Sequence, residues 1–415
     1  MNKNVVFTIC AKNYLAQALT LKKSFKNQNP NCDFFLFLSD DSDGLADEVN
    51  DIILLNDHWI SDWKQMAFKY NVIEFSTSIK PFCFKKLFDQ NYSKVIYLDP
   101  DTYVTNPLDE IFNFLDKKSI VLTPHYCNIQ TEYTGSITEE EILFVGIYNL
   151  GFTAIKNDIT GSKIVNWWMN RLSNKCYADK FDALHVDQKW MDFIPAFFPN
   201  DTLITHHLGV NPAIWNLHER ELIISENNQY QIRDTSSQEV FPLLFFHFSG
   251  FDPFNPKLIN RRHPKYNTDI YPSYIPLFGE YVKGVYDNGY DRYSHMLYSF
   301  NSFEDGENIL PLYRRLYRAF ESEFTEQNPF KKGTLFFNEL KKAKLLTGLK
   351  TSKVTIYTNN ERNKKGIFIK LIIGSFKILK KIIGIRYYYS LLVFLNDFTR
   401  FEKQGFLLNR NEQNK

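Results

Sequence analysis

The sequence predicts an α/β fold whose β-sheet is mostly parallel and is covered by helices on both faces. Within residues 1–125, short continuous apolar runs alternate with segments whose apolar residues recur at helical spacing. Strands that are buried on both faces have continuous apolar runs, and parallel sheets are buried in this way. Ligands of such sheets bind beyond the carboxyl ends of the strands. We therefore searched for a site where apolar runs end in polar residues.

The expected elements follow in order along the chain. Apolar runs predict strands at residues 5–10, 33–41, 51–57, 95–98, 120–123 and 146–158. Helical spacing predicts helices at residues 14–25 and 79–88, and a further helix that contains Trp167 and Trp168. The common phosphate-binding loops GxGxxG and GxxxxGKS/T do not occur in the sequence.

The composition excludes some classes of protein. The 415 residues have a net charge of +2, and five widely spaced cysteines form no CxxC pair. A balanced charge argues against a protein that wraps nucleic acid, so no nucleic-acid partner is expected. The cysteine pattern fits a reducing compartment and offers no zinc site. The chain starts with a predicted strand instead of a secretory signal, so we expect a cytoplasmic location.

The stretch "KVIYLDPDTYVTNPLDEIF" contains the first candidate site. Asp99 and Asp101 follow a buried strand, and side chains two apart on an extended chain point to the same side. Pro100 favours an extended Asp99, while Asn106 is placed to cap a helix with Pro107 at its first position. Two converging carboxylates suit a divalent cation, and such a cation suits a diphosphate.

Other interpretations of this stretch compete with a metal site. An EF-hand loop starting at Asp99 is excluded, because Tyr103 and Val104 occupy positions that need an oxygen ligand and a glycine. A phosphatase of the haloacid-dehalogenase type would use Asp99 as its nucleophile, although Tyr103 stands at the fifth position of that motif. A plain acidic turn is the remaining alternative.

Further segments resemble a known family over roughly residues 4–255. The aspartate pair resembles the DxD site of nucleotide-sugar glycosyltransferases with the GT-A fold, and is similar to the family-eight type, which includes glycogenin and lipopolysaccharide galactosyltransferases. "VVFTICAKNYLAQALTLKKSF", "YNLGFTAI", "VDQKWMDF" and "FFHFSG" match that family in order. A group of bacterial polysaccharide glycosyltransferases is similar through "YLDPD", "YNLGF", "VDQKWMD", "WNLHER" and "HFSGFDP".

The resemblance implies roles for individual residues. The metal ligands would be Asp99, Asp101 and His247. The residues that bind the donor nucleotide sugar would be Thr8, Cys10, Asn13, Tyr14, Asn149 and Gly250, and Lys80 is a further candidate cation for its phosphates. The residues near the reacting carbon would be Asp187 and Gln188. The residues on the acceptor side would be Trp215, Asn216 and His218.

Each role has a structural alternative. His247 could be a satisfied core histidine, Asn149 a cap of its strand, Asp187 a helix cap and Trp215 a core residue. The sequence also departs from the family-eight pattern, because no lysine–proline pair follows "HFSG". Lys257 or Arg261 would have to hold the diphosphate in its place.

The resemblance implies a retaining transfer of sugar from a nucleotide-diphosphate sugar, with Mn²⁺ or Mg²⁺ as cofactor. The implied acceptor is a glycan or a lipid-linked glycan of the bacterial surface, such as polysaccharide, lipopolysaccharide or capsule. Inversion would need a carboxylate base, for which Asp187 and Asp252 are the candidates. A non-catalytic sugar-binding scaffold is the non-enzymatic alternative.

The expected organisation is a GT-A catalytic domain at residues 1–325 and a helical region at residues 326–415. The nucleotide-binding half would span about residues 1–125, and the half that completes the metal and acceptor sites would span about residues 126–325. The region after residue 325 is basic, and "KKGIFIKLIIGSFKILKKIIGIRYYYSLLVFL" is also apolar.

This C-terminal stretch has the pattern of an amphipathic helix. On a helical wheel the apolar side chains Ile372, Phe376, Leu379 and Ile383 fall together, and Lys370, Lys377 and Lys381 fall opposite them. The longest uncharged run is too short to span a bilayer. We expect the helix to lie in the plane of the inner membrane surface, with packing on the catalytic domain or on a protein partner as the alternative.

Overall fold

The computed structural model describes residues 3–49, 52–348 and 366–408. The chain divides into two compact units. The first consists of the residues up to Met66 together with Val72–Tyr298, and the second consists of Ala67–Asn71 together with the residues from Ser299 onward. The sequence suggested a division near residue 325, so the compact units divide earlier in the chain. The division by function stays a prediction.

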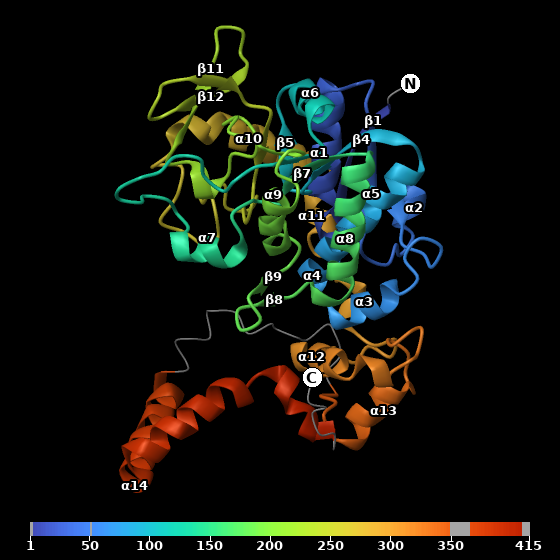
Figure 1. Cartoon of the computed structure of the whole chain (residues 1–415), viewed down its shortest axis with the longest axis vertical. Helices are drawn as coiled ribbons and strands as arrows, with labels where there is room; N and C mark the ends of the chain where they lie inside the picture. Colours follow the sequence, from blue (N-terminus) through green and yellow to red (C-terminus); the bar gives the residue numbers. More distant parts are fainter. Residues whose placement is uncertain (1–2, 50–51, 349–365, 409–415) are drawn as a thin grey trace. The chain divides into compact units, whose positions relative to one another are not determined.

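The first unit is built on a seven-stranded sheet, which confirms the predicted α/β architecture (Figure 1). In spatial order the strands are β10 (Thr202–Ile204), β6 (Ile120–Leu122), β7 (Phe152–Lys156), β4 (Tyr92–Leu98), β1 (Lys3–Cys10), β2 (Asp33–Leu38) and β3 (Ile52–Leu54). All neighbouring pairs are parallel except those that β7 makes with β4 and β6. The sheet is therefore mostly parallel, as expected.

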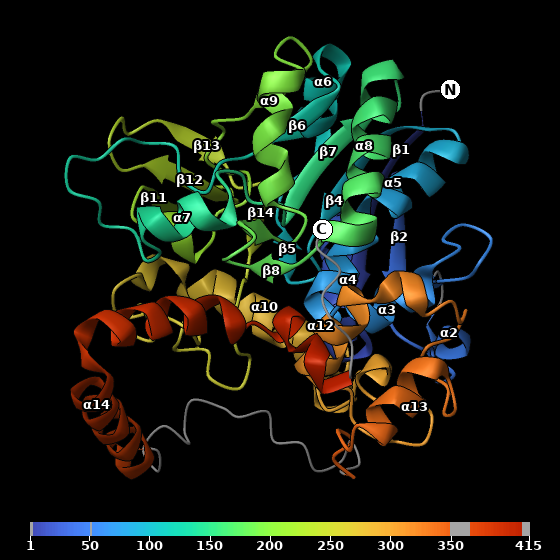
Figure 2. The same ribbon diagram turned by 60° about the horizontal axis from the view of Figure 1, so that its bottom comes forward.

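Helices cover both faces of the sheet (Figures 1 and 2). The helices of this unit are α1 (Leu15–Gln28), α2 (Leu45–Glu48), α3 (Trp63–Lys69, whose last residues belong to the second unit), α4 (Val72–Ser78), α5 (Lys80–Asp89), α6 (Asp109–Lys117), α7 (Glu139–Val145), α8 (Ile159–Lys175), α9 (Ile194–Phe197), α10 (Ile275–Asp287) and α11 (Tyr290–Tyr293). On one face Phe7 of β1 contacts Phe84 of α5 at 4.9 Å between ring centroids, and α8 packs on α5. On the other face Val6 and Ile96 pack in one buried cluster with residues of α1 and α6.

Three smaller sheets carry the remaining strands of this unit. They consist of β5 (Thr102–Val104) with β14 (Phe245–His247), of β8 (Ala178–Asp179) with β9 (Leu184–His185), and of β11 (Arg220–Ile224), β12 (Tyr230–Asp234) and β13 (Val240–Pro242). All of these pairs are antiparallel.

Two local expectations differ from the structure. The predicted strand at residues 146–158 narrows to β7, because the residues before Phe152 make the turn that enters the sheet. The predicted cap at Asn106 is wrong: α6 starts at Asp109, and the Asn106 side chain donates to the carbonyl oxygen of Leu243 at 2.6 Å. Asn106 therefore ties the loop after the aspartate pair to the strand that carries His247.

The second unit is helical and has an aromatic core. It contains α12 (Pro311–Ala319), α13 (Leu335–Lys342) and α14 (Gly366–Phe398). Phe68 contacts four aromatic rings of this unit, those of Phe303, Tyr317, Phe330 and Phe336. Among the described residues, no helix is both long and apolar enough to cross a membrane.

Candidate metal centre

A short antiparallel ribbon brings the aspartate pair and His247 together. Strand β5 directly follows the pair, and β14 ends in His247. In their register His247 lies opposite Thr102, and the amide of Phe248 donates to the carbonyl oxygen of Asp101 at 2.8 Å. The aspartates lie beyond the carboxyl end of β4, where ligands of such sheets bind.

The three side chains form the one group of potential metal ligands found among the described residues. Their ligand atoms lie within 4.8 Å of one another. Nε2 of His247 lies 3.2 Å from Oδ1 of Asp101 and 3.6 Å from Oδ2 of Asp99. The histidine side chain is 4% exposed, whereas those of Asp99 and Asp101 are 29% and 16% exposed. The cluster is thus buried on the histidine side and open on the carboxylate side.

His247 is oriented by Asn211. The Nδ1 of His247 lies 3.2 Å from Oδ1 of Asn211, whose Nδ2 donates to Oδ1 of Asn149 at 3.0 Å. Because an amide oxygen can only accept, Nδ1 carries a proton, and Nε2 is the ring nitrogen that faces the carboxylates. Asn211 adopts a φ of 57°, a left-handed conformation that asparagine tolerates.

Gly151 leaves the space that the imidazole occupies. A Cβ atom at this position would lie 2.3 Å from Cε1 of His247 and 2.6 Å from its Nδ1. The carbonyl oxygen of Gly151 also accepts from the amide of Asp99 at 2.8 Å. Glycine is therefore required here by close packing against His247.

The carboxylates dominate the electrostatics of His247. Burial by itself would lower the pKa of His247, but the charges of Asp101 and Asp99 outweigh burial and raise the pKa above its ordinary value. The hydroxyl of Tyr97 donates to Oδ1 of Asp99 at 2.5 Å, and burial raises the pKa of Tyr97. The tyrosine thus stays a neutral donor that orients this carboxylate.

Asp187 forms a buried ion pair with Lys80. Their side chains are 3% and 1% exposed, and Nζ of Lys80 lies 2.5 Å from Oδ2 of Asp187 and 2.8 Å from the carbonyl oxygen of Leu150. The same ammonium lies 4.1 Å from the centre of the Tyr97 ring. Burial raises the pKa of Asp187, although Lys80 opposes this effect. Lys80, which the sequence suggested as a cation for phosphate, is instead engaged by Asp187.

Gln188 and Asn149 are part of the same buried network. Oε1 of Gln188 accepts from the amide of Leu150 at 3.0 Å, and its Nε2 donates to the carbonyl oxygen of Val145 at 2.9 Å. Nδ2 of Asn149 lies 3.4 Å from Oε1 of Gln188 and 3.3 Å from Nε2 of His125. Burial lowers the pKa of His125 to about 4, so that histidine is neutral.

The other residues expected to bind the donor follow β1. Thr8 and Cys10 are buried in that strand, and Asn13 and Tyr14 lie half-buried in the turn before α1. Burial raises the pKa of Tyr14, and the charge of Asp101 raises it further, so the Tyr14 hydroxyl lies within electrostatic reach of Asp101.

Two exposed arginines lie near Tyr14. The charges of Arg261 and Arg262 oppose the rise in the pKa of Tyr14. The amide of Arg261 donates to the carbonyl oxygen of Gly250 at 3.0 Å. Gly250 has a φ of 69°, and a Cβ atom there would lie 2.6 Å from Nδ2 of Asn260, so glycine is required for this turn. The turn after His247 is therefore followed by two cations that act on Tyr14.

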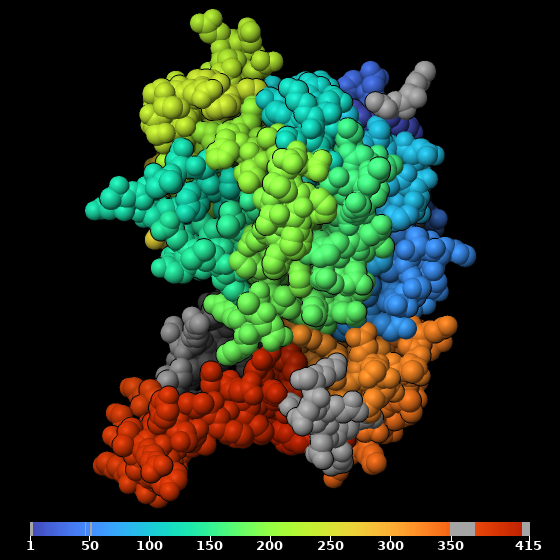
Figure 3. Space-filling view, viewed as in Figure 1, coloured from blue at the N-terminus to red at the C-terminus, as the bar shows by residue number. Residues whose placement is uncertain are grey.

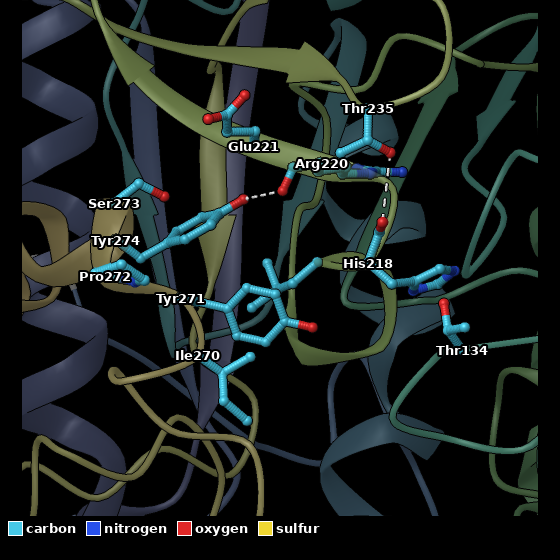
Figure 4. A pocket seen from close by; sticks show the side chains of 11 residues that line it. Thr134, His218, Arg220, Glu221, Thr235, Ile270, Tyr271, Pro272, Ser273 and Tyr274 are labelled. Atoms are coloured by element: carbon cyan, nitrogen blue, oxygen red, sulfur yellow. Dashed lines mark hydrogen bonds between the residues drawn. The ribbon is translucent and has the colours of Figure 1, made fainter.

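The three residues expected on the acceptor side separate in the structure. Trp215 is 3% exposed and its ring lies 5.2 Å from that of His247, while Asn216 is fully buried and donates to the carbonyl oxygen of His125 at 2.9 Å. His218 instead lines a cavity of about 510 Å³ beside Tyr271 and Thr134 (Figure 4). Burial lowers the pKa of His218. The acceptor roles of these residues stay predictions.

Sequence reasoning missed Asn211, Tyr97 and His125. Tyr97 lies within the predicted strand at residues 95–98, and its two-residue spacing from Asp99 could have indicated that both side chains point to the same side. His125 follows the predicted strand at residues 120–123, and Asn211 precedes a proline in "VNPAIW". The contacts of His125 with Asn149 and of Asn211 with His247 join residues that are distant in the sequence, so only the folded chain creates them.

Comparison with known proteins gave distant similarities. No protein-family model matches the chain. The uncharacterized protein YfnF of Bacillus subtilis (strain 168) is 24% identical over 273 residues, which cover 63% of this chain and 86% of that protein.

Among solved structures, the galactosyltransferase LgtC in complex with donor and acceptor sugar analogues is similar with a TM-score of 0.39 and 15% identity, over 68% of this chain and 95% of that chain. The glycosyltransferase GlyE of Streptococcus pneumoniae TIGR4 has a TM-score of 0.38 and 15% identity, over 73% of this chain and 67% of that chain. The bifunctional enzyme WbbM has a TM-score of 0.38 and 13% identity, over 69% of this chain and 52% of that chain.

Proposed function

We propose that the protein is a metal-dependent glycosyltransferase of the GT-A type. In this proposal it moves a sugar from a nucleotide-diphosphate sugar to a glycan or lipid-linked glycan of the bacterial surface. The observation that carries the proposal is the convergence of Asp99, Asp101 and His247. They come from distant parts of the sequence and meet on the β5–β14 ribbon, beyond the end of β4.

The ligand set fits a divalent cation of the Mn²⁺ type. Two carboxylates and one imidazole offer a mixed oxygen and nitrogen site. The Nδ1 of His247 is paired with Asn211, which leaves Nε2 available as the ligand atom. A divalent cation bound there would stabilise the negative charge of a departing nucleoside diphosphate.

The chain supplies further groups for a diphosphate. Arg261 and Arg262 are exposed and lie near Tyr14, close to the carboxylate cluster. A guanidinium binds phosphate oxygens through two parallel N–H donors. We assign to these arginines the role that a lysine has in the family-eight pattern.

The state of Asp187 supports a retaining reaction. An inverting enzyme needs a carboxylate base within hydrogen-bond reach of the acceptor hydroxyl. Asp187 is 2% exposed and is held by Lys80, so its carboxylate serves as the partner of a buried cation. Asp187 acts through Lys80, which donates to the carbonyl oxygen of Leu150, and Gln188 accepts from the amide of Leu150. Their role is to hold this residue, just before β7, where the sugar would lie.

The proposed enzyme works in the cytoplasm at the inner face of the membrane, where a lipid-linked acceptor would be found. This location rests on the basic helix α14, whose exposed side chains are described in the next subsection.

An assay with nucleotide sugars tests the function. Purified full-length protein, stripped of metal with a chelator, is supplied with a panel of nucleotide sugars with and without Mn²⁺. We expect release of the nucleoside diphosphate only with Mn²⁺, and a rate at least about 100-fold lower for Asp101→Asn. Asp109→Asn, an exposed carboxylate in the first turn of α6, is the matched control and should react like the unmodified protein.

The same assay separates the alternatives. Equal rates for Asp101→Asn and the unmodified protein would refute the metal-dependent mechanism. Release of inorganic phosphate with an aspartyl-phosphate at Asp99 would instead identify a phosphatase. Binding of a nucleotide sugar without turnover of any donor would identify a scaffold. Thermal stabilisation reports such binding, since a ligand at 100 times its dissociation constant adds about 2.7 kcal/mol of stability.

A further inference from the structure

Helix α14 exposes many large apolar side chains. Its fractional exposures include 66% for Leu371, 60% for Ile378, 75% for Ile382 and 67% for Ile385. Other exposed apolar or aromatic side chains of the helix are Ile372, Ile373, Tyr387, Tyr389, Leu392, Val393 and Phe394. Contiguous exposed apolar surface of this kind marks a site of interaction with a protein or a membrane.

Gly384 interrupts helix α14 and divides it into a first arm before this residue and a second arm after it. The bend of α14 is visible in the ribbon diagram (Figure 2), and the space-filling view shows the same segment in red (Figure 3). Gly384 has a φ of 76° and a ψ of 166°, outside the helical region. Across the bend the rings of Phe376 and Tyr388 lie 6.3 Å apart. The sequence suggested an apolar face of four residues. Of these, Phe376, Leu379 and Ile383 are half-buried on this inner side of the bend, whereas Ile372 is 40% exposed.

The apolar face that remains exposed on the first arm is a different one. Leu371, Ile378 and Ile382 recur at positions i, i+7 and i+11, so they form one stripe along the helix. We call this stripe, defined by these three residues, the outer stripe. The sequence alone could not distinguish it from the stripe around Phe376, because the distinction depends on the bend.

Positive charge accompanies the outer stripe. Lys370, Lys377 and Lys381 follow one another along the polar side of the first arm, and Lys380 and Arg386 add two more charges. All five are exposed, and none forms an ion pair with any residue in the described ranges. Asp397 is the single acidic residue between residues 366 and 398.

We propose that the first arm of α14 docks in the plane of an anionic lipid bilayer through the outer stripe. Leu371, Ile378 and Ile382 would enter the boundary between headgroups and acyl chains, and the lysines would contact the phosphate groups. Charge complementarity favours a bilayer over a second copy of this chain, because two such basic helices would repel one another. The proposal does not depend on the glycosyltransferase activity, since it rests on α14 alone.

Co-sedimentation with vesicles tests the proposal. Full-length protein is mixed with vesicles of phosphatidylcholine, alone or with phosphatidylglycerol, at low and high salt. We expect binding to the anionic vesicles that weakens at high salt. Ile378→Asn combined with Ile382→Asn should weaken binding by about 100-fold or more. Lys377→Gln combined with Lys381→Gln should weaken it by roughly 5- to 30-fold.

Matched controls lie on α8. Ile159 is 78% exposed and Lys163 is exposed, so Ile159→Asn and Lys163→Gln make the same chemical changes elsewhere on the surface. Both controls should bind vesicles like the unmodified protein. Because all the substituted side chains are exposed, circular dichroism should show unchanged helix content in every variant.

Three outcomes would overturn the proposal. They are equal binding to neutral and anionic vesicles, no binding to either, and unchanged binding after substitution of the outer stripe. A dimer in sedimentation analysis that the Ile378 and Ile382 substitutions dissociate, without lipid binding, would assign the stripe to a second copy of the chain.

Discussion

At the scale of single residues, the position of the His247 imidazole depends on a glycine at position 151, because a Cβ atom there would overlap the ring. His247 lies against the backbone of Gly151, and Asn211 accepts its Nδ1 proton. The ring is therefore held by a packing contact and by a hydrogen bond before any ligand binds. A ligand held in this way loses little freedom when it coordinates a cation.

Replacement of Gly151 by alanine tests this packing. We expect Gly151→Ala to displace the His247 ring, because the added Cβ would lie 2.3 Å from Cε1. The affinity for Mn²⁺, measured by electron paramagnetic resonance of the free ion, should fall by about 10- to 100-fold. Urea unfolding should show a loss of about 1–3 kcal/mol from overpacking.

Gly279→Ala provides the control for Gly151→Ala. Gly279 lies in α10 with nothing within 4 Å of an added Cβ, so the substitution should leave Mn²⁺ affinity unchanged. Stability should rise by about 0.5–1 kcal/mol, because alanine favours a helix more than glycine does. Unchanged Mn²⁺ affinity in Gly151→Ala would contradict the proposed role of His247 as a ligand.

Asn211 acts on the site through His247. Asn211→Gly allows the positive φ but removes the oxygen that accepts the Nδ1 proton of His247. Asn211→Asp tolerates the positive φ and also retains an accepting oxygen. We expect Mn²⁺ affinity to fall by about 10- to 100-fold in the glycine variant and by less in the aspartate variant. A glycine variant that is folded and binds Mn²⁺ as tightly as the unmodified protein would show that Asn211 does not position the ligand.

The sequence predicted the parts of the site that are local. Asp99 and Asp101 were recognisable because a strand end and a two-residue spacing point both carboxylates to one side. Lys80 illustrates what the sequence could not show. Its charge suggested a phosphate contact, but it is buried and paired with Asp187, which lies far away in the sequence.

At the scale of elements, the second unit depends on one buried guanidinium. Arg314 of α12 is 4% exposed. Its Nη1 donates to the carbonyl oxygens of Ala67, Phe68 and Tyr70 at 2.7–2.9 Å, and its Nη2 donates to that of Phe300 at 2.6 Å. One side chain thus connects residues of the 67–71 segment to the helices that follow Tyr298.

Arg314→Lys should destabilise this unit. The single ammonium of a lysine cannot replace both nitrogens of the planar Arg314 guanidinium, so some of the buried carbonyl groups would be left without a donor. We expect a loss of about 2–4 kcal/mol, measured as urea unfolding by circular dichroism. Arg318→Lys on the same helix keeps its ion pair with Glu402 and should cost less than about 1 kcal/mol. If Arg314→Lys and Arg318→Lys had equal free energies of unfolding, the buried guanidinium of Arg314 would contribute nothing to the stability of this unit.

Helix boundaries show the limits of local rules. The local sequence predicted a helix capped by Asn106 with Pro107 at its first position, yet α6 begins at Asp109. The Asn106 side-chain amide donates to the carbonyl oxygen of Leu243, which lies between β13 and β14, so a tertiary contact replaced the local cap. Each predicted strand, in contrast, overlaps a strand of the sheet, because continuous apolar runs reflect burial in the sheet itself, although the one at residues 146–158 narrows to β7.

At the scale of the whole molecule, the sequence predicted the mostly parallel sheet, whereas the division into functional domains stays a prediction. The segment 67–71 belongs to the compact unit that contains the residues after Tyr298. No composition change marks this pairing, since it joins residues that are remote in sequence. The exposed face of α14 was similarly unpredictable, because the bend at Gly384 decides which of two apolar stripes is covered.

The β5–β14 ribbon has a consequence for biosynthesis. During translation, Asp99 and Asp101 are synthesised well before His247, their partner on the β5–β14 ribbon. At about 5–20 residues per second, the interval between them lasts on the order of ten seconds. During this interval the nascent chain has two carboxylates without their imidazole partner. The protein is therefore made without a complete cation site, and competence for catalysis would begin only when the ribbon closes.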